Sequence, residues 1–191
     1  MKVLGINGSA RKDGNTAILI RAAFRELEAA GIETELVQLA EMKIKGCAAC
    51  YLCGKNLNQR CAIEDDDVNG IIKKMQAADG FILGSPTYFS DITSEMKALI
   101  DRTGFVAKMN GGMFARKVGA GAVAVRRGGA IHAFDTINHF FLISEMIIPG
   151  SIYWNIGYGR ERGDVESDEE GMRTMTMVGK NMAWLLKKIQ G

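Results

Sequence analysis

Apolar strand-like segments alternate with helix-like segments along the whole chain, and this alternation limits the fold more than any other feature. Short apolar or β-branched runs predict strands at residues 3–7, 33–38, 80–84, 118–125 and 147–154, the last interrupted by Pro149-Gly150. Helices are predicted at residues 15–30, 66–77, 94–103, 129–145 and 167–189. Continuous apolar strands that alternate with helices are typical of a parallel sheet covered on both faces. We therefore expect an α/β fold with a doubly wound five-stranded parallel sheet, order 2-1-3-4-5, in a single domain of residues 1–191.

Composition and charge exclude several classes of function. The chain is 47% hydrophobic and carries a net charge of +2, with basic and acidic residues interspersed. It has no basic stripe of the kind that nucleic-acid binding needs, and no apolar run long enough to span a bilayer. Its N-terminus lacks the pattern of a signal peptide. We therefore expect a cytoplasmic protein that binds neither nucleic acid nor membrane.

All four cysteines fall within fifteen residues, spaced Cys47-x2-Cys50-x2-Cys53-x7-Cys61, in a long connection at about 40–65. A loop of this length in a compact domain is usually functional. In a reducing compartment, clustered cysteines more often bind metal or do redox work than form disulfides. Four thiolates at this spacing can hold an iron–sulfur cubane, but they also suit tetrahedral zinc or can remain free thiols. We interpret the acidic run at residues 64–67 as capping of the following helix rather than as a metal site.

The segment after the first predicted strand reads Gly8-Ser9-Ala10-Arg11-Lys12-Asp13-Gly14-Asn15-Thr16. It is expected at the carboxyl edge of the sheet, where ligands bind in parallel α/β folds. The backbone N–H groups at the start of a helix attract phosphate. Short side-chain donors come from Ser9, Asn15 and Thr16, and Arg11 adds a charged donor. Both the Walker A pattern and the dinucleotide fingerprint are missing, so the segment predicts a single terminal phosphate, as in a mononucleotide. The alternative is a capped βα turn without a ligand.

Three segments carry a resemblance to a known family, and the first of them is the loop just described. Gly8-Ser9-x-Arg11-x-x-Gly14-Asn15-Thr16 resembles the phosphate loop of the NADPH-dependent FMN reductase group of flavodoxin-like proteins. Gly84-Ser85-Pro86-Thr87-Tyr88-Phe89-Ser90-Asp91 resembles the isoalloxazine loop of that group, and Ser94-x-Met96-Lys97-x-Leu99-Ile100-Asp101-Arg102 resembles the helix after it. The resemblance implies a flavodoxin-like fold and an FMN-dependent oxidoreductase, with NADPH or NADH as electron donor.

FMN is accordingly expected across three loops at the carboxyl edge. Pro86 stiffens the second loop, Thr87 and Asp91 offer side-chain contacts, and Tyr88 and Phe89 offer ring surface, unless the two rings only plug the end of the sheet. The third loop is residues 125–130, where two glycines permit close approach of the backbone to the flavin. Arg126 or Arg127 can stabilise reduced FMN or hold the phosphate of a nicotinamide cofactor, unless both arginines belong to a solvated turn. No catalytic side chain is expected, because the flavin carries the chemistry. The expected cofactor-binding residues are Ser9, Arg11, Asn15, Thr16, Ser85, Pro86, Thr87, Tyr88, Phe89, Asp91, Arg126, Gly128 and Gly129.

Within the wider family, the cysteine spacing resembles that of the iron–sulfur flavoproteins, which pair a compact [4Fe–4S] motif with FMN on this fold. The resemblance implies Cys47, Cys50, Cys53 and Cys61 as cluster ligands. It also implies a homodimer or homotetramer in which cluster and flavin approach each other across a subunit boundary. The wide apolar face of the helix at 129–145 independently predicts a subunit contact through Phe134, Ile137, Phe140, Phe141 and Leu142. We interpret His132 and His139 as surface or interface residues.

Two other functions remain open at this point. One is an electron carrier that is reduced by ferredoxin and has no nicotinamide site. The other is a non-enzymatic, zinc-stabilised module that binds a phosphorylated ligand. For both the FMN-dependent oxidoreductase and the electron carrier, the expected redox partner is a small molecule or another protein.

Overall fold

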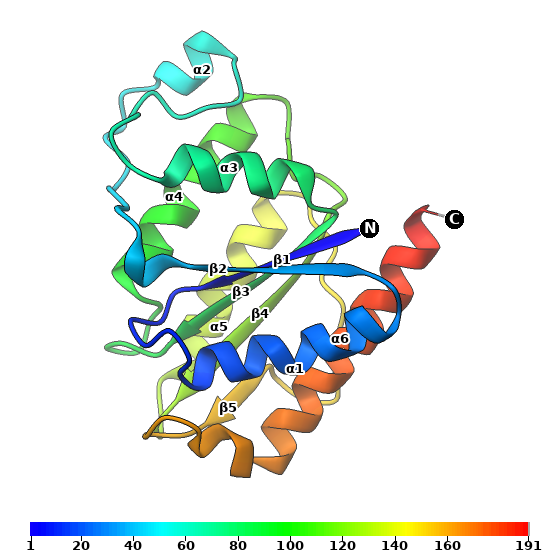
Figure 1. Cartoon of the computed structure of the whole chain (residues 1–191). Helices are drawn as coiled ribbons and strands as arrows, with labels where there is room; N and C mark the ends of the chain where they lie inside the picture. The colour runs from blue at the N-terminus through cyan, green and yellow to red at the C-terminus, as the bar shows by residue number, and fades with distance from the viewer. Residues whose placement is uncertain (191) are drawn as a thin grey trace.

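A five-stranded parallel sheet forms the centre of the computed structural model, which describes residues 1–190 (Figure 1). Its strands are β1 (Lys2–Asn7), β2 (Glu33–Gln38), β3 (Gly80–Pro86), β4 (Val118–Val125) and β5 (Ile156–Tyr158). All neighbouring pairs are parallel, in the order β2-β1-β3-β4-β5. The predicted flavodoxin-like α/β fold is therefore confirmed. Gly191, the last residue of the predicted domain, lies outside the described range.

Helices cover both faces of the sheet. One face carries α1 (Asn15–Ala29) and α6 (Glu169–Gln190), which pack against each other, and the other carries α3 (Val68–Ala77), α4 (Ser94–Met109) and α5 (Ala130–Ile143) (Figure 1). Shorter elements are α2 (Leu52–Asn56) and the 3-10 turns η1 (Leu39–Glu41) and η2 (Asp164–Ser167). Among residues 1–190, no helix has the length and apolar character needed to cross a lipid bilayer.

The core lies along the two central strands. Every residue of β4 is buried, and so is β3 up to Ser85, because helices cover these strands on both sides. Small residues in β4 let a helix come close: a Cβ at Gly119 would lie 2.7 Å from the ring of Phe141 in α5. The sheet is thus a tightly packed platform whose carboxyl ends hold the connecting loops in place.

The fifth strand is not where the sequence predicted it. The expected strand at residues 147–154 is wrong, since β5 covers only Ile156–Tyr158. Ile147 does pair with the start of β4, donating its N–H to Lys117 O (2.9 Å) and accepting from Gly119 N–H (3.0 Å). Pro149 has no N–H to continue this ladder, so the chain leaves the sheet and rejoins it at Ile156.

Helix α4 is longer than the predicted range 94–103, because it continues through Gly104 to Met109. Thr93 caps its start by accepting a hydrogen bond from Met96 N–H (3.3 Å). Gly104 lies within the helix and does not end it. Its missing side chain leaves room for α5, because a Cβ there would lie 3.2 Å from the Phe140 ring. The helix ends at Met109, shortly before Gly111 and Gly112, whose φ values are +81° and +73°.

Residues 43–67, called here the cysteine loop, form an excursion between β2 and α3. The loop contains α2 and lies beyond α3 and α4, away from the sheet, at the top of Figure 1. Two hydrogen bonds close its base: Asp67 N–H donates to Lys43 O (3.0 Å), and Lys43 N–H donates to Asp67 Oδ2 (2.7 Å). The long connection expected at 40–65 is therefore an ordered loop with a closed base.

Candidate functional site

Three loops meet at the carboxyl edge of the sheet: residues 8–14 after β1, 87–93 after β3 and 126–129 after β4 (left side of Figure 1). Thr93 joins the first two by donating its hydroxyl to Gly8 O (3.0 Å). The third loop touches the second at Gly129, where a Cβ would lie 2.7 Å from Ser90 Oγ and 3.0 Å from Ser90 Cα. The structure thus brings together the loops that the sequence predicted to share one site.

The first loop is braced from below. Ser9 is buried; its Oγ accepts from Arg11 N–H (3.1 Å), and its carbonyl accepts from Gln38 Nε2 (2.6 Å). Asn7 Oδ1 accepts from Ser9 N–H (3.0 Å), and Asn7 Nδ2 donates to Gln38 Oε1 (2.6 Å). Sequence reasoning missed Asn7 and Gln38, although a polar residue at the end of an apolar strand was a signal that it lines the edge.

The start of α1 offers unpaired donors. Gly14 supplies no capping side chain, and the first turn contains no acidic residue. Within residues 1–190, the N–H groups of Asn15, Thr16 and Ala17 have no hydrogen-bond acceptor. Exposed Arg11 lies in the same loop. This end of α1 therefore has the donors and the dipole orientation that suit a phosphate group.

Asn15 has a different role from the predicted one, because its side chain is used within the protein. Its Nδ2 donates to Glu161 O (2.9 Å), and its Oδ1 accepts from Gly163 N–H (2.9 Å). Arg11 Nη1 also donates to Arg160 O (3.1 Å). The segment 159–163 therefore lies over the first loop, and the Asn15 side chain holds this cover in place, which leaves only the backbone N–H of Asn15 unpaired.

Two other predicted side chains, Ser85 at the end of β3 and Asp91 in the second loop, are likewise engaged inside the protein. Ser85 is fully buried; its Oγ donates to Pro86 O (2.8 Å) and accepts from Thr93 N–H (3.0 Å). Asp91 Oδ1 accepts from Thr136 Oγ1 in α5 (2.8 Å). Thr87 differs, because its Oγ1 is buried and has no hydrogen-bond partner among the described residues. Such an orphaned hydroxyl is rare in proteins and suits a bound polar ligand.

The tip of the second loop is a strained turn. Tyr88 and Asp91 exchange two backbone hydrogen bonds (2.8 and 3.0 Å), and Phe89 and Ser90 have φ values of +48° and +66°. Phe89 is 107% exposed and Tyr88 48% exposed, so the alternative that these rings plug the sheet is wrong. Left-handed non-glycine residues cost about 1–2 kcal/mol each and concentrate at functional sites.

The third loop borders two hollows. Thr87, Val125, Arg126, Arg127 and Gly128 line a cavity of about 380 Å³. On its other side, a cavity of about 270 Å³ is lined by residues that include Trp154 and Thr174, whose buried hydroxyl also lacks a partner among residues 1–190. Neither arginine forms an ion pair within the described chain. Both charges are therefore available to an anionic ligand.

The four cysteines line a single cavity of about 20 Å³, although they come from two ends of the cysteine loop. All four are free thiols, with Cys47 and Cys50 exposed and Cys53 buried. Burial raises the pKa of the Cys53 thiol, and the neighbouring Cys61 and Cys50 raise it further. In the described part of the chain, no three Cys, His, Asp or Glu side chains are arranged to hold a single metal ion. The donor set is the one that a cubane requires, and the space would have to widen to take one.

Two asparagines anchor the cysteines to the helices below. Asn69 of α3 accepts from Cys61 N–H (2.8 Å) and donates to Cys61 O (2.9 Å). Asn110, at the end of α4, donates to Cys53 O (3.2 Å). Sequence reasoning missed both residues, since only the fold brings Asn110 close to Cys53. The thiols are therefore held on the rigid α3–α4 layer.

The backbone of the cysteine loop is strained around the thiols. Ala49, Tyr51, Leu57 and Gln59 are non-glycine residues with φ between +49° and +61°. Tyr51 is held in place by an edge-on contact with the ring of Phe105 in α4 (5.4 Å between centroids). The loop thus maintains a costly shape that gathers the cysteines.

A buried ion pair lies beside the cysteine cavity, between Asp66 of the loop and Arg102 of α4, and both side chains are 0% exposed. Burial alone would raise the pKa of Asp66, but hydrogen bonds from Arg102 and from the Lys45 and Val68 N–H groups lower it below its usual value. The interpretation of the acidic run as helix capping is therefore confirmed for Asp66, but it is incomplete. That carboxylate caps Val68 N–H (3.2 Å) with one oxygen and pairs with Arg102 through the other.

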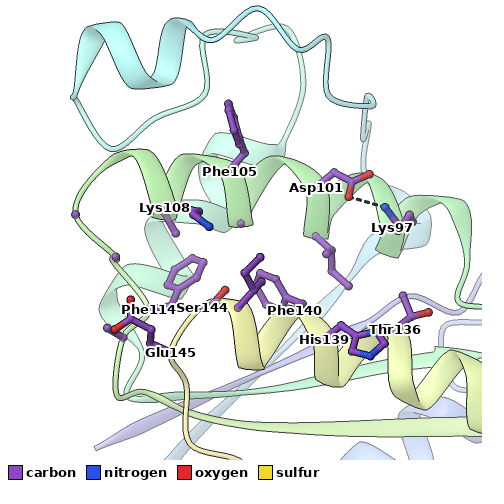
Figure 2. Close-up of a pocket in the computed structure, with 17 residues that line it drawn as sticks. Lys97, Asp101, Phe105, Lys108, Phe114, Thr136, His139, Phe140, Ser144 and Glu145 are labelled. Carbon is purple, nitrogen blue, oxygen red and sulfur yellow. Dashed lines mark hydrogen bonds and ion pairs between the residues drawn. The ribbon is translucent and has the colours of Figure 1, made fainter.

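A groove of about 820 Å³ separates α4 from α5 (Figure 2). Phe114 and Phe140 form its floor, and Lys97 and Asp101 form an ion pair at its rim. Most of the predicted contact face of α5 is not on the surface: Ile137, Phe140 and Phe141 are buried in the core, and Phe134 packs against it. The exposed apolar residues of α5 are Leu142 (61%) and, unpredicted, Ile143 (65%), together with Ile131. His132 and His139 are both exposed.

Comparisons with known proteins agree with this geometry. The sequence profile of the family described as NADPH-dependent FMN reductase matches residues 1–161. An iron–sulfur flavoprotein of Methanocaldococcus jannaschii is 39% identical over the full length of both chains. One of Methanosarcina thermophila is 33% identical over all of this chain and 97% of its own. The solved NAD(P)H:quinone oxidoreductase of Methanothermobacter marburgensis superposes with a TM-score of 0.70 over 95% of this chain and 96% of its own, at 15% identity, a likeness of fold alone.

Proposed function

The chain belongs to the NADPH-dependent FMN reductase family, and from this premise we propose that it is an FMN-dependent oxidoreductase that also holds a [4Fe–4S] cluster. The flavin part rests on one observation, the set of unpaired donors where three loops meet at the carboxyl edge. These are the N–H groups at the start of α1 and the orphaned Thr87 hydroxyl. Binding FMN there would give each of them a partner.

The protein's own residues supply binding, orientation and charge. The first loop and Arg11 hold the phosphate, the turn at 88–91 lies against the ring system, and Gly129 lets the third loop approach. When bound, the flavin would accept a two-electron hydride and the cluster would carry single electrons. The two unpaired arginines, Arg126 and Arg127, favour NADPH or NADH as donor, because they can hold a nucleotide's phosphate.

Cluster ligation by Cys47, Cys50, Cys53 and Cys61 is supported by their shared cavity and by the names of the relatives, which are iron–sulfur flavoproteins. Four reduced thiols also suit a reducing compartment, so we place the protein in the cytoplasm. Helix α4 connects the two sites: it starts beside the second loop, and Arg102, eight residues after Ser94, lies about 12 Å further along its axis.

The active form in this proposal is a homodimer or a dimer of dimers. The α4–α5 face has the groove, exposed Leu142 and Ile143, and fully exposed Phe89 beyond the start of α4. A second copy packed on this face about a two-fold axis would bring the cysteine loop of each chain toward the flavin loops of the other. Light scattering should give the mass of a dimer or tetramer. Ile143→Glu should lower that mass, whereas Trp184→Glu, equally exposed at 63% on α6, should not.

The experiment that tests the function counts iron and flavin per chain after anaerobic purification. We expect about one FMN and about four irons. Replacing Cys53 or Cys61 with Ser should remove iron and leave the flavin. A colourless preparation with zinc and no flavin would instead support the phospholigand-binding module. Reduction of the bound flavin by reduced ferredoxin, but by neither NADPH nor NADH, would support the ferredoxin-linked carrier.

A further inference from the structure

Arg102 is the largest fully buried side chain in the described part of the protein, and both of its terminal nitrogens are hydrogen-bonded. Its Nη1 pairs with Asp66 Oδ2 and donates to Lys45 O (3.1 Å), and its Nη2 donates to Ile63 O (3.2 Å). Its Nε is buried and has no partner among residues 1–190. A buried arginine nitrogen without a partner is unusual, because most buried polar groups in proteins are hydrogen-bonded.

The guanidinium of Arg102 lies beside the four cysteines. Arg102 lines the small cavity that all four cysteines share, whereas Asp66 does not. Burial would lower the pKa of Arg102, but the Asp66 carboxylate and the Cys61 thiol, both next to it, raise it above its usual value. The positive charge therefore lies at the wall of the cysteine cavity, next to both Cys61 and the Asp66 carboxylate.

A charge in this place would act strongly on an electron accepted by a cluster that the four thiolates hold. An arginine remains protonated even when buried, and solvent screens a buried charge much less than an exposed one. A fixed positive charge favours the more reduced, more negative form of a neighbouring redox centre. The carboxylate behind it acts in the opposite direction, but from further away.

We propose that Arg102 is a positioning residue for the redox centre on the cysteines, and that its buried guanidinium raises the reduction potential of that centre while Asp66 limits the increase. The inference rests on the proposed function, because it needs the four thiolates to hold a cluster. A purely structural pair, which only ties the cysteine loop to α4, would leave the potential unchanged.

The test is an anaerobic redox titration of the holoprotein, followed by electron paramagnetic resonance of the reduced cluster. Arg102→Gln should lower the midpoint potential, and Asp66→Asn should raise it. The double variant, which is neutral like the native pair, should fall between the two. Lys73→Gln removes an exposed charge from the neighbouring helix α3 and should leave the potential unchanged, since solvent screens it.

The possible outcomes separate the inference from the proposed function. If the unaltered protein contains no iron, the proposed cluster is wrong. If iron is present and the two single variants have the potential of the unaltered protein, or shift it in the same direction, the role of Arg102 is overturned. If Arg102→Gln loses its iron, the other two variants still decide. The inference then requires a potential above that of the unaltered protein in Asp66→Asn and a potential below it in the double variant.

Discussion

Gly129 is the position where a single methyl group should separate the loops of the flavin site. It has φ of +84°, and a Cβ there would lie 2.7 Å from Ser90 Oγ and 3.0 Å from Ser90 Cα. Gly129→Ala therefore combines backbone strain with a steric clash. Gly31 separates the two effects: it has nearly the same φ, +80°, but a Cβ there would meet nothing within 4 Å, and it lies at the opposite end of α1.

The magnitudes follow from these contacts. A left-handed backbone costs an alanine about 1–2 kcal/mol, so Gly31→Ala should lower the free energy of unfolding by that amount. Gly129→Ala adds the clash with Ser90, whose backbone can yield only by moving the turn at 88–91. Overpacking of this kind costs about 1–3 kcal/mol more. The displaced turn should weaken FMN binding about tenfold, which corresponds to about 1.4 kcal/mol.

Urea unfolding of the two apoproteins and FMN titration followed by flavin fluorescence measure both quantities. We expect Gly31→Ala to bind FMN as the unaltered protein does. Equal stability losses in the two variants, together with equal FMN affinities, would show that the third loop does not need its close approach to Ser90 and would refute the reasoning.

Three further changes test other parts of the structure. Asn15→Ala should cost about 1–2 kcal/mol and speed hydrogen exchange at Gly163, because it removes the two bonds that hold the cover; an unchanged exchange rate would contradict this role. Asp66→Asn should cost about 3 kcal/mol at pH 7, because it leaves Arg102 buried and uncompensated. Because folding lowers the pKa of Asp66, its contribution to the free energy of unfolding is complete above the unfolded-state pKa of about 4 and is lost as the pH falls through the folded-state pKa. Urea unfolding from pH 7 to pH 3 should therefore show a shrinking difference in the free energy of unfolding between Asp66→Asn and the unaltered protein. Thr93→Val should cost about 1–2 kcal/mol through the lost cap and the lost bond to Gly8, and a loss of less than a few tenths in the same assay would exclude this double role.

Sequence reasoning succeeded where a local pattern determines the result. The strands at 33–38 and 118–125 match β2 and β4 at both ends, because periodicity and flanking residues define them. The phosphate loop and the turn after Pro86 were likewise predicted to share an edge, since the carboxyl ends of parallel strands must meet there. Locally encoded features thus carried both the fold and the approximate place of the site.

It failed where the partner of a residue is distant in the chain. Asp66 has the sequence context of a helix cap, and only the fold shows Arg102, 36 residues away, at its other oxygen. Asn15 was assigned to the ligand, but its side chain bonds a segment 146 residues further on. The roles of buried polar side chains depend on such distant partners, so no pattern within a short window could reveal them.

The closed base of the cysteine loop makes this part of the protein a removable module. Because Lys43 and Asp67 hold the two ends together, the chain leaves β2 and enters α3 at nearly the same point, whatever lies between. A short turn could replace the excursion without disturbing the sheet, although α4 would then expose Arg102 and Phe105, which the loop now covers. The cysteine-containing insert and the sheet that supports it can therefore be gained, lost or exchanged separately during evolution.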